Sequence, residues 1–187
     1  MIFEPAVFGD TRGFFVEAWN QERYAEAGLN ANFVQDNISR SARNVLRGLH
    51  FQNPDPQGKL VSVLEGEVFD VAVDVRVGSP TFGEWFGVIL DGSSKRQMYV
   101  PEGFAHGFVV LSEVATFMYK CTSLYAPAHE SALIWNDPMV NIEWPVDQPF
   151  ISAKDNQGLT LQQLKDEGRL PLYRETADDI IKVAAGY

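Results

Sequence analysis

Short alternations of apolar and polar residues dominate this 187-residue chain up to about residue 153. The clearest lies at 67–75 (EVFDVAVDV), where Phe69, Val71 and Val73 form one strongly apolar face. This pattern is typical of a strand, because successive side chains of a strand point to opposite faces. Comparable segments predict further strands at 14–18, 45–51, 59–64, 84–91, 97–100, 106–111, 115–121 and 131–135.

Turn residues separate these segments, and helical periodicity stays weak until the end of the chain. Clusters such as NPDPQG at 53–58 are typical of turns between strands. Helices are predicted at 20–26, with Asn20 as the N-cap, and at 160–167 and 176–184. Many short strands with a few short peripheral helices predict an all-β fold, a sandwich or jelly-roll barrel.

The chain is expected to form a single domain over residues 1–187. Its length suits one sizeable core, and it contains no internal repeat, low-complexity tract or linker-like stretch. We expect the core to span about residues 1–155 and a helical tail to follow from about 156 to 187, and the sequence assigns that tail no role.

Composition places the chain among ordinary globular proteins, with 45% hydrophobic and 21% charged residues. No apolar run approaches the ~20 residues that span a bilayer, so no membrane is expected. The first residues, MIFEPAVFGDTRG, lack the features of a signal peptide. The single cysteine, Cys121, cannot form an internal disulfide, which agrees with a reducing compartment. These features predict a cytoplasmic protein.

Net charge argues against one class of partner. The formal charge is −10, whereas general nucleic-acid binding requires a basic surface, so no nucleic-acid partner is expected. A small anionic ligand stays compatible with this charge, because a few clustered arginines and lysines make a locally positive pocket.

Candidate chemistry begins with His50, one of three histidines. It lies in VLRGLHFQ and is followed nine residues later by Lys59, so Arg47, His50 and Lys59 fall on two successive predicted strands. Histidine is the usual general base near neutral pH, and a lysine suits a developing oxyanion. A histidine in a strand-rich segment is more often a packed residue, and a strand-end lysine is more often solvated, so the grouping is what favours chemistry.

One geometric difficulty concerns Arg47 and His50. Strict alternation puts residues 47 and 50 on opposite faces of a strand. Gly48 lies between them, and a glycine inside a strand often marks a bulge that changes the register. If both side chains face one pocket, an irregularity is expected at Gly48.

His106 lies in PEGFAHGF, a Pro-x-Gly-x-x-His pattern that resembles the second signature of the cupin superfamily. In metal-binding cupins the first signature supplies His-x-His followed by Glu, whereas this chain has His50-Phe51-Gln52. Because a metal needs three or four convergent donors, we expect no metal. His106 is then a ligand-contacting or a structural histidine.

A run of motifs at compatible spacing resembles the dTDP-4-dehydrorhamnose 3,5-epimerase family over about residues 1–155. The stretches are GDTRGFFVEAW, NFVQDNISRSARNVLRGLHFQ, QGKLVSVLEGEVFDVAVDVR, SPTFGEW, VPEGFAHGFVVLSE, YKCTSLYAP and LIWNDP. The resemblance implies a cupin-like jelly roll, a homodimer, and a dTDP-linked 4-keto-6-deoxyhexose as substrate. It implies no cofactor, and the chain also lacks the GxGxxG fingerprint of dinucleotide-binding domains.

The resemblance also implies roles for matching residues. His50 matches the catalytic base, Asp155 the aspartate that orients it, Tyr119 the proton donor on the opposite face, and Lys59 the lysine beside the keto oxygen. The positions implied to contact nucleotide or sugar are Arg12, Glu17, Gln35, Asn37, Arg47, His106, Glu130 and Lys154. Phe14 and Tyr125 are candidates to pack on the thymine, with core packing equally open. Taken singly, Tyr119 would equally be a core aromatic and Asp155 a turn residue.

The expected reaction is inversion of carbons 3 and 5 of dTDP-4-dehydro-6-deoxy-D-glucose to give dTDP-4-dehydro-L-rhamnose through an enolate. Three alternatives remain at this point. One is an epimerase that inverts a single carbon of another deoxysugar. A metal-dependent cupin enzyme is disfavoured by the missing His-x-His, and a sugar-nucleotide binder without catalysis is the third.

Overall fold

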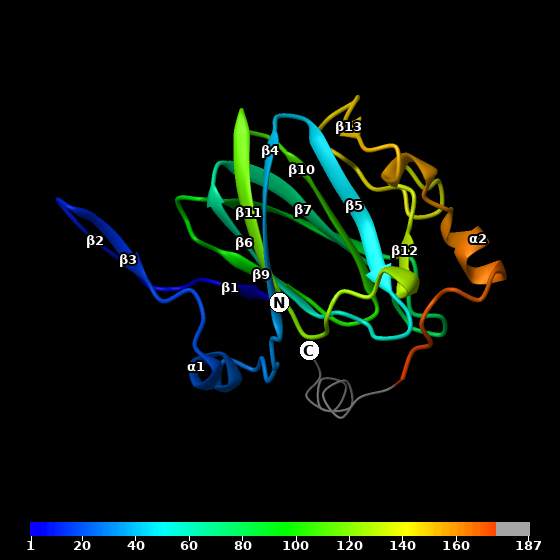
Figure 1. Ribbon diagram of the computed structural model, residues 1–187, viewed down its shortest axis with the longest axis horizontal. Helices are drawn as coiled ribbons and strands as arrows, with labels where there is room; N and C mark the ends of the chain where they lie inside the picture. Colours follow the sequence, from blue (N-terminus) through cyan, green and yellow to red (C-terminus); the bar gives the residue numbers. More distant parts are fainter. Residues whose placement is uncertain (175–187) are drawn as a thin grey trace.

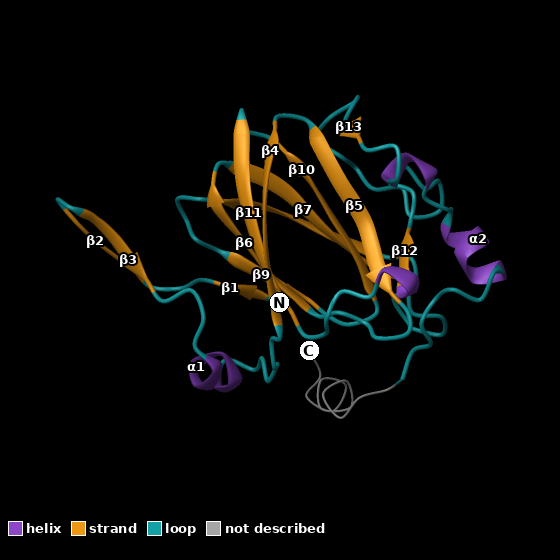
Figure 2. Ribbon diagram, in the orientation of Figure 1, coloured by secondary structure: helices purple, strands orange, loops and turns teal. Residues whose placement is uncertain are grey.

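The computed structural model describes residues 1–174, and in it two β-sheets face each other as a barrel (Figure 1). The five-stranded sheet has the order β1 (Ile2–Phe3), β9 (Gln97–Val100), β6 (Lys59–Glu65), β11 (Val114–Cys121) and β4 (Gln35–Ala42). The six-stranded sheet has the order β12 (Glu130–Ala132), β5 (Val45–Gln52), β10 (Phe104–Val110), β7 (Glu67–Asp74) and β8 (Trp85–Asp91), with β13 (Phe150–Ile151) parallel to β5. Strands dominate the described chain (Figure 2), so the all-β prediction is confirmed.

The main core fills the space between the two sheets. Its side chains come from the inward faces of both, for example Val61 and Phe117 from the five-stranded sheet and Val68 and Phe108 from the six-stranded sheet. Phe108 and Phe117 stack across the barrel with ring centroids 4.1 Å apart. This apolar layer closes one part of the interior and leaves polar side chains of the same strands to line the rest.

Helices and loops cover the outer faces of both sheets. Helix α2 (Leu161–Asp166) packs Leu161 and Leu164 onto the six-stranded sheet, and a capping box at Thr160 begins it. Helix α1 (Gln21–Glu26) begins at Asn20, whose side chain accepts hydrogen bonds from two backbone N–H groups, and packs Tyr24 near Leu60 of β6. The helices predicted at 20–26 and 160–167 are confirmed, whereas the one at 176–184 lies outside the described residues.

A two-stranded hairpin of β2 (Val7–Asp10) and β3 (Gly13–Val16) projects from the barrel (Figure 1). Its strands pair with each other and with no other strand among the described residues. Large apolar side chains on it are exposed, including Phe8, Phe14 and Phe15. The hairpin therefore presents an exposed apolar surface.

The predicted strands agree with those observed to within a few residues, except that 131–135 is only Glu130–Ala132. Strand β4 and the short strands β1, β2 and β13 were not predicted. Two short 3-10 helices, Pro127–His129 and Asp155–Gln157, complete the described elements. Of the helices in residues 1–174, none has the length and apolar character to cross a membrane.

Candidate active site

One cavity of about 390 Å³ inside the barrel collects most of the residues singled out in the sequence. Strands of both sheets and the segment after β13 contribute to its wall. The predicted residues that line it are Asn37, Arg47, His50, Lys59, His106, Tyr119, Lys154 and Asp155. The polar part of the barrel interior is therefore a single site.

The irregularity expected at Gly48 is present. His50 pairs with His106 of β10 and Arg47 pairs with Phe108, so two residues of β5 lie opposite the single residue Gly107. This bulge brings Arg47 and His50 to the same face, and both line the cavity. Gly48 has φ +120°, and a Cβ on it would lie 2.6 Å from the Gly107 Cα, so only glycine fits here.

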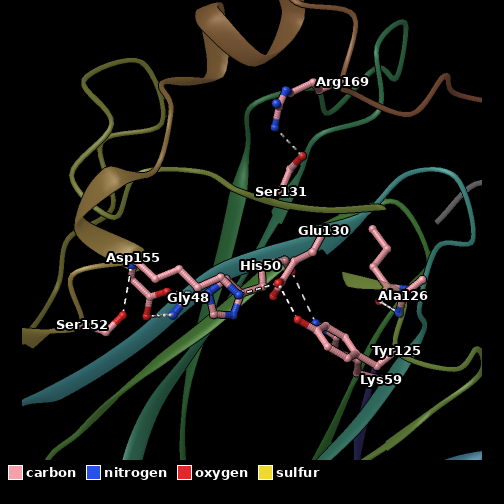
Figure 3. Close-up of polar contacts among 12 residues, drawn as sticks. Gly48, His50, Lys59, Tyr125, Ala126, Glu130, Ser131, Ser152, Asp155 and Arg169 are labelled. Atoms are coloured by element: carbon pink, nitrogen blue, oxygen red, sulfur yellow. Dashed lines mark hydrogen bonds and ion pairs between the residues drawn. The ribbon is translucent and has the colours of Figure 1, made fainter. Parts of the chain in front are cut away.

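His50 is hydrogen-bonded to Asp155, which lies at the start of a 3-10 helix beyond β13. The imidazole Nε2 and the carboxylate Oδ1 are 2.7 Å apart, and the Gly48 N–H points to the other carboxylate oxygen at 3.4 Å. The Asp155 N–H donates to the Ser152 hydroxyl at 3.0 Å (Figure 3). Burial alone would raise the pKa of Asp155, but the hydrogen bond and charge of His50 outweigh it and hold that pKa below its usual range.

Tyr119 reaches the same cavity from β11, on the opposite sheet from His50. Its hydroxyl has no hydrogen-bond partner among the described residues, and no buried side-chain nitrogen or oxygen in them lacks a partner. The hydroxyl is therefore open to the cavity. Burial, together with the negative charge of Glu130, raises the pKa of the Tyr119 phenol. It keeps its proton across the physiological pH range.

Lys59 begins β6 and is buried, with 7% of its surface exposed. Its Nζ donates to the His50 carbonyl oxygen at 3.4 Å. Burial lowers the pKa of this ammonium, while the carboxylates of Glu130 and Asp70 act in the opposite direction. An amine held beside the base and open to the cavity is placed to meet an anion that forms there.

His106 pairs with Asp70, a residue that sequence reasoning missed as part of the site. The imidazole Nε2 lies 3.0 and 3.1 Å from the two carboxylate oxygens of Asp70, and both residues are buried. Asp70 belongs to the clearest predicted strand, on the face opposite Phe69 and Val71. The available clue was an acidic residue between the apolar Val68 and Ala72 on that face, since such a residue is rarely buried without a partner.

Glu130 organises a second group of polar residues beside His50. Its carboxylate accepts a 2.8 Å hydrogen bond from the Tyr125 hydroxyl and is ion-paired with Lys154. These hydrogen bonds outweigh burial and lower the pKa of Glu130. Figure 3 shows His50 between Asp155 on one side and Glu130 on the other. The base candidate thus lies between two carboxylates.

Strand β4 supplies polar side chains to the wall of the site. Gln35 donates to Asn37 at 3.0 Å and accepts from the Tyr125 backbone N–H at 2.8 Å. Arg47 is steadied by Ser41, whose hydroxyl accepts from Nε at 2.9 Å. The rest of the Arg47 guanidinium is available to a ligand in the cavity.

The structure does not bring Arg12, Phe14 and Glu17 to this cavity. Arg12 lies at the tip of the hairpin, where its side chain is 87% exposed and is held by Asp10. Phe14 lies on β3 and is exposed, and Glu17 forms an ion pair with Arg23 at 3.1 Å. Within one chain these three residues are separate from the site. Nor do residues 1–174 contain a group of three or more His, Cys, Asp or Glu side chains that could hold a metal ion.

The fold and the site together define a class of jelly-roll proteins with an imidazole, a phenol and a buried amine around one interior cavity. The model of the dTDP-4-dehydrorhamnose 3,5-epimerase family matches residues 1–163. The chain belongs to this family.

Individual members of this family are similar to the chain in sequence and in structure. A dTDP-4-dehydrorhamnose 3,5-epimerase of Pseudomonas aeruginosa is 61% identical over 84% of this chain and 88% of its own length. One from Salmonella typhimurium is 57% identical over 87% of this chain and 91% of its own length. The crystal structure of dTDP-6-deoxy-D-glucose-3,5-epimerase from Legionella pneumophila, in complex with dTDP-4-keto-L-rhamnose, matches with a TM-score of 0.89 at 55% identity, covering 93% of each chain. The cupin-like jelly roll is thereby confirmed.

Proposed function

We propose that this protein inverts carbons 3 and 5 of dTDP-4-dehydro-6-deoxy-D-glucose and so produces dTDP-4-dehydro-L-rhamnose. One observation carries the proposal. The His50 imidazole, paired with Asp155, and the Tyr119 phenol come from opposite sheets and open into one cavity, which the Lys59 side chain also lines. Membership of the epimerase family supports the same reaction.

The chemistry of the substrate explains why these groups are suited to it. Carbons 3 and 5 both adjoin the ketone at carbon 4, so removal of a proton from either gives an enolate with its charge mainly on the ketone oxygen. His50 takes that proton, and Asp155 stabilises the imidazolium that forms. Lys59 stabilises the oxyanion. Tyr119 then returns a proton to the opposite face of the carbon, which inverts it. No step needs nicotinamide, flavin or a metal.

The nucleotide diphosphate requires cationic groups against the acidic background of this chain. Arg47 and Lys154 line the cavity, and a guanidinium is well matched to phosphate oxygens. Asn37, Gln35, Glu130 and His106 would contact the sugar and nucleotide as polar partners. Tyr125 would pack on the thymine, and its exposed ring agrees with that role.

A homodimer would bring in the hairpin residues that lie away from the cavity. Arg12 and Phe14 are exposed on a hairpin that projects from its own barrel (Figure 1), and Glu17 follows it in sequence. We propose that a second copy receives this hairpin, so that Arg12, Phe14 and Glu17 act at the partner's site. The exposed rings of Phe8 and Phe15 would be covered by the same contact.

Two further proposals concern the chain as a whole. We propose a single domain, because the segment after residue 155 supplies Leu161 and Leu164 to the core of the six-stranded sheet. We also propose the cytoplasm as the location, because Cys121 is a buried free thiol and the substrate is a nucleotide-activated sugar.

NMR of the purified protein with dTDP-4-keto-6-deoxyglucose in heavy water tests the function. The expected result is deuterium at both carbons 3 and 5, together with the L-configured product. Exchange and inversion at one carbon alone would identify a single-carbon epimerase. Binding of the nucleotide sugar with no exchange would identify a binder without catalysis, and exchange that requires a stoichiometric transition metal would identify a metal-dependent enzyme.

A further inference from the structure

We propose that Asp70 is a positioning residue of this site. In this proposal, which rests on the proposed function, Asp70 holds His106 as a hydrogen-bond acceptor toward the ketosugar and keeps the Lys59 amine charged beside the carbonyl. Asp70 itself does not line the cavity, but both of the groups through which it would act do. Nothing in the family resemblance quoted from the sequence assigns it a role.

The position of Asp70 is unusual for a carboxylate. It is 0% exposed on the inward face of β7, between Val68 and Ala72, which both belong to the apolar core between the sheets. An unpaired charge is strongly disfavoured in such surroundings. The acid is matched by the buried His106, so its place on this face is explained by that pair and not by apolar packing.

Asp70 determines which nitrogen of His106 carries the proton. The Nε2 atom lies within 3.1 Å of both carboxylate oxygens, so this nitrogen is the donor. The other nitrogen, Nδ1, has no partner in residues 1–174, yet none of the buried side-chain nitrogens there lacks one, so Nδ1 opens to the cavity. The ring stacks on Phe117, with centroids 6.0 Å apart and planes at 22°. His106 is therefore fixed as an acceptor that faces the ligand.

Asp70 also lies near Lys59 through two neighbouring residues. The Lys59 Nζ donates to the His50 carbonyl oxygen at 3.4 Å, and His50 pairs with His106, which is bonded to Asp70. The Cys121 thiol of β11, Glu130 of β12 and Asp70 of β7 all favour the charged form of Lys59. Burial raises the pKa of Asp70, and His106 and Lys59 act in the opposite direction. Burial favours the neutral amine, and a negative charge in the interior opposes that effect. Loss of this charge would make Lys59 release its proton at a lower pH, and a neutral amine stabilises an oxyanion less.

The Asp70→Asn variant tests this linkage, since an asparagine has nearly the same shape and no charge. We expect kcat/KM at pH 8 to fall by about tenfold or more, and its decline at high pH to begin at a lower pH than in the wild type. The direction follows because activity is lost as pH rises through the Lys59 pKa, and that pKa falls when the Asp70 charge is removed.

Asp74→Asn is the matched control. Asp74 is a buried acid on the same strand, it is bound by Arg76, Ser79 and Thr81, and it does not line the cavity. Its loss is expected to lower the melting temperature and to leave the alkaline decline in place. An active Asp70→Asn protein with an unmoved alkaline decline overturns the proposal, as does an equal shift in the control.

A second measurement does not depend on the variant folding or on turnover. Nitrogen-15 NMR of the wild-type protein, which has only three histidines, should show His106 with its proton on Nε2 and none on Nδ1. A proton on Nδ1 overturns the proposal. If the wild-type protein fails to exchange deuterium into the substrate, the proposed function is wrong. The proposal for Asp70 and His106 is still tested in that case, because the nitrogen-15 spectrum needs no turnover.

Discussion

His50 and Asp155 are 105 positions apart in the chain, and the imidazole Nε2 of the first lies 2.7 Å from the carboxylate Oδ1 of the second. The contact is made because β13 pairs with β5 and places the following 3-10 helix against the strand that carries His50. The Gly48 N–H, in the bulge of that strand, points to the same carboxylate. His50 and Asp155 are thus both positioned by the pairing of β5 with β13.

Replacement of His50 by alanine is expected to abolish deuterium incorporation at both carbons, with a loss of about 10²–10⁴-fold or more in rate, the usual contribution of a general base. The measurement is NMR of the substrate in heavy water. His129→Ala is the control, because His129 is an ion-paired histidine on a 3-10 helix that does not line the cavity. Undiminished exchange in the His50 variant would rule out its role as the base.

The Asp155→Asn variant should change how stability depends on pH. The pKa of Asp155 is lowered in the folded protein from an ordinary value of 3.8, so the unfolded chain binds more protons when the pH approaches that value. The carboxylate therefore contributes stability that is complete above about pH 5 and is lost as the pH falls through the folded pKa. We expect the wild type to be the more stable protein at pH 6 and the difference to shrink toward pH 3, in urea titrations at several pH values. A difference that stays constant with pH would contradict this assignment.

The apolar strand pattern predicted most of the long strands and missed β4, whose inward side chains are polar. In β4 the inward side chains include Gln35 and Asn37, while the apolar Ile38 points outward and is 65% exposed. A period-2 search for an apolar face therefore finds nothing there. In β4 the polar side chains point inward and the apolar one outward, which is the reverse of the pattern that identifies ordinary strands.

The candidate site could be predicted only in part, for two different reasons. Gly48 indicated the bulge correctly, since a glycine between Arg47 and His50 was the single local feature that would align them. Asp70 could not be assigned, because the strand pattern does not reveal that His106 lies beside it on the neighbouring strand. Arg12 was predicted in the site from its motif, but the structure of one chain places it on the projecting hairpin. A local sequence pattern does not show which strands pair with each other or which residues meet a second chain.

Tyr119→Phe should separate the two halves of the reaction. The variant keeps the ring in its place and removes only the hydroxyl that opens to the cavity. We expect the first exchange of deuterium, which needs His50, to continue while formation of the inverted product falls by about 10²-fold or more. Both are read from the same NMR time course. Tyr99→Phe, at a half-buried tyrosine of β9 outside the cavity, is the control. An equal loss of exchange and product would argue against a selective donor role.

Gly48→Ala tests whether the bulge itself is needed for the site. The added Cβ would lie 2.6 Å from the Gly107 Cα and 2.7 Å from the His106 carbonyl oxygen, at a φ of +120°. We expect a loss of about 1–3 kcal/mol in the free energy of unfolding from the strained backbone, or more from the clash, measured by urea denaturation. Activity should fall further than stability explains, because β5 must move and His50 with it.

The Gly78→Ala variant separates the effect of backbone strain from that of a steric clash. Gly78 also has a positive φ, of +90°, but nothing lies within 4 Å of the added Cβ. Its variant should lose stability through backbone strain alone and keep full epimerisation at a temperature where it is folded. If Gly48→Ala behaves in the same way, with activity retained, then the close approach of β5 and β10 does not position His50, and the Asp155 contact alone must hold the imidazole in place.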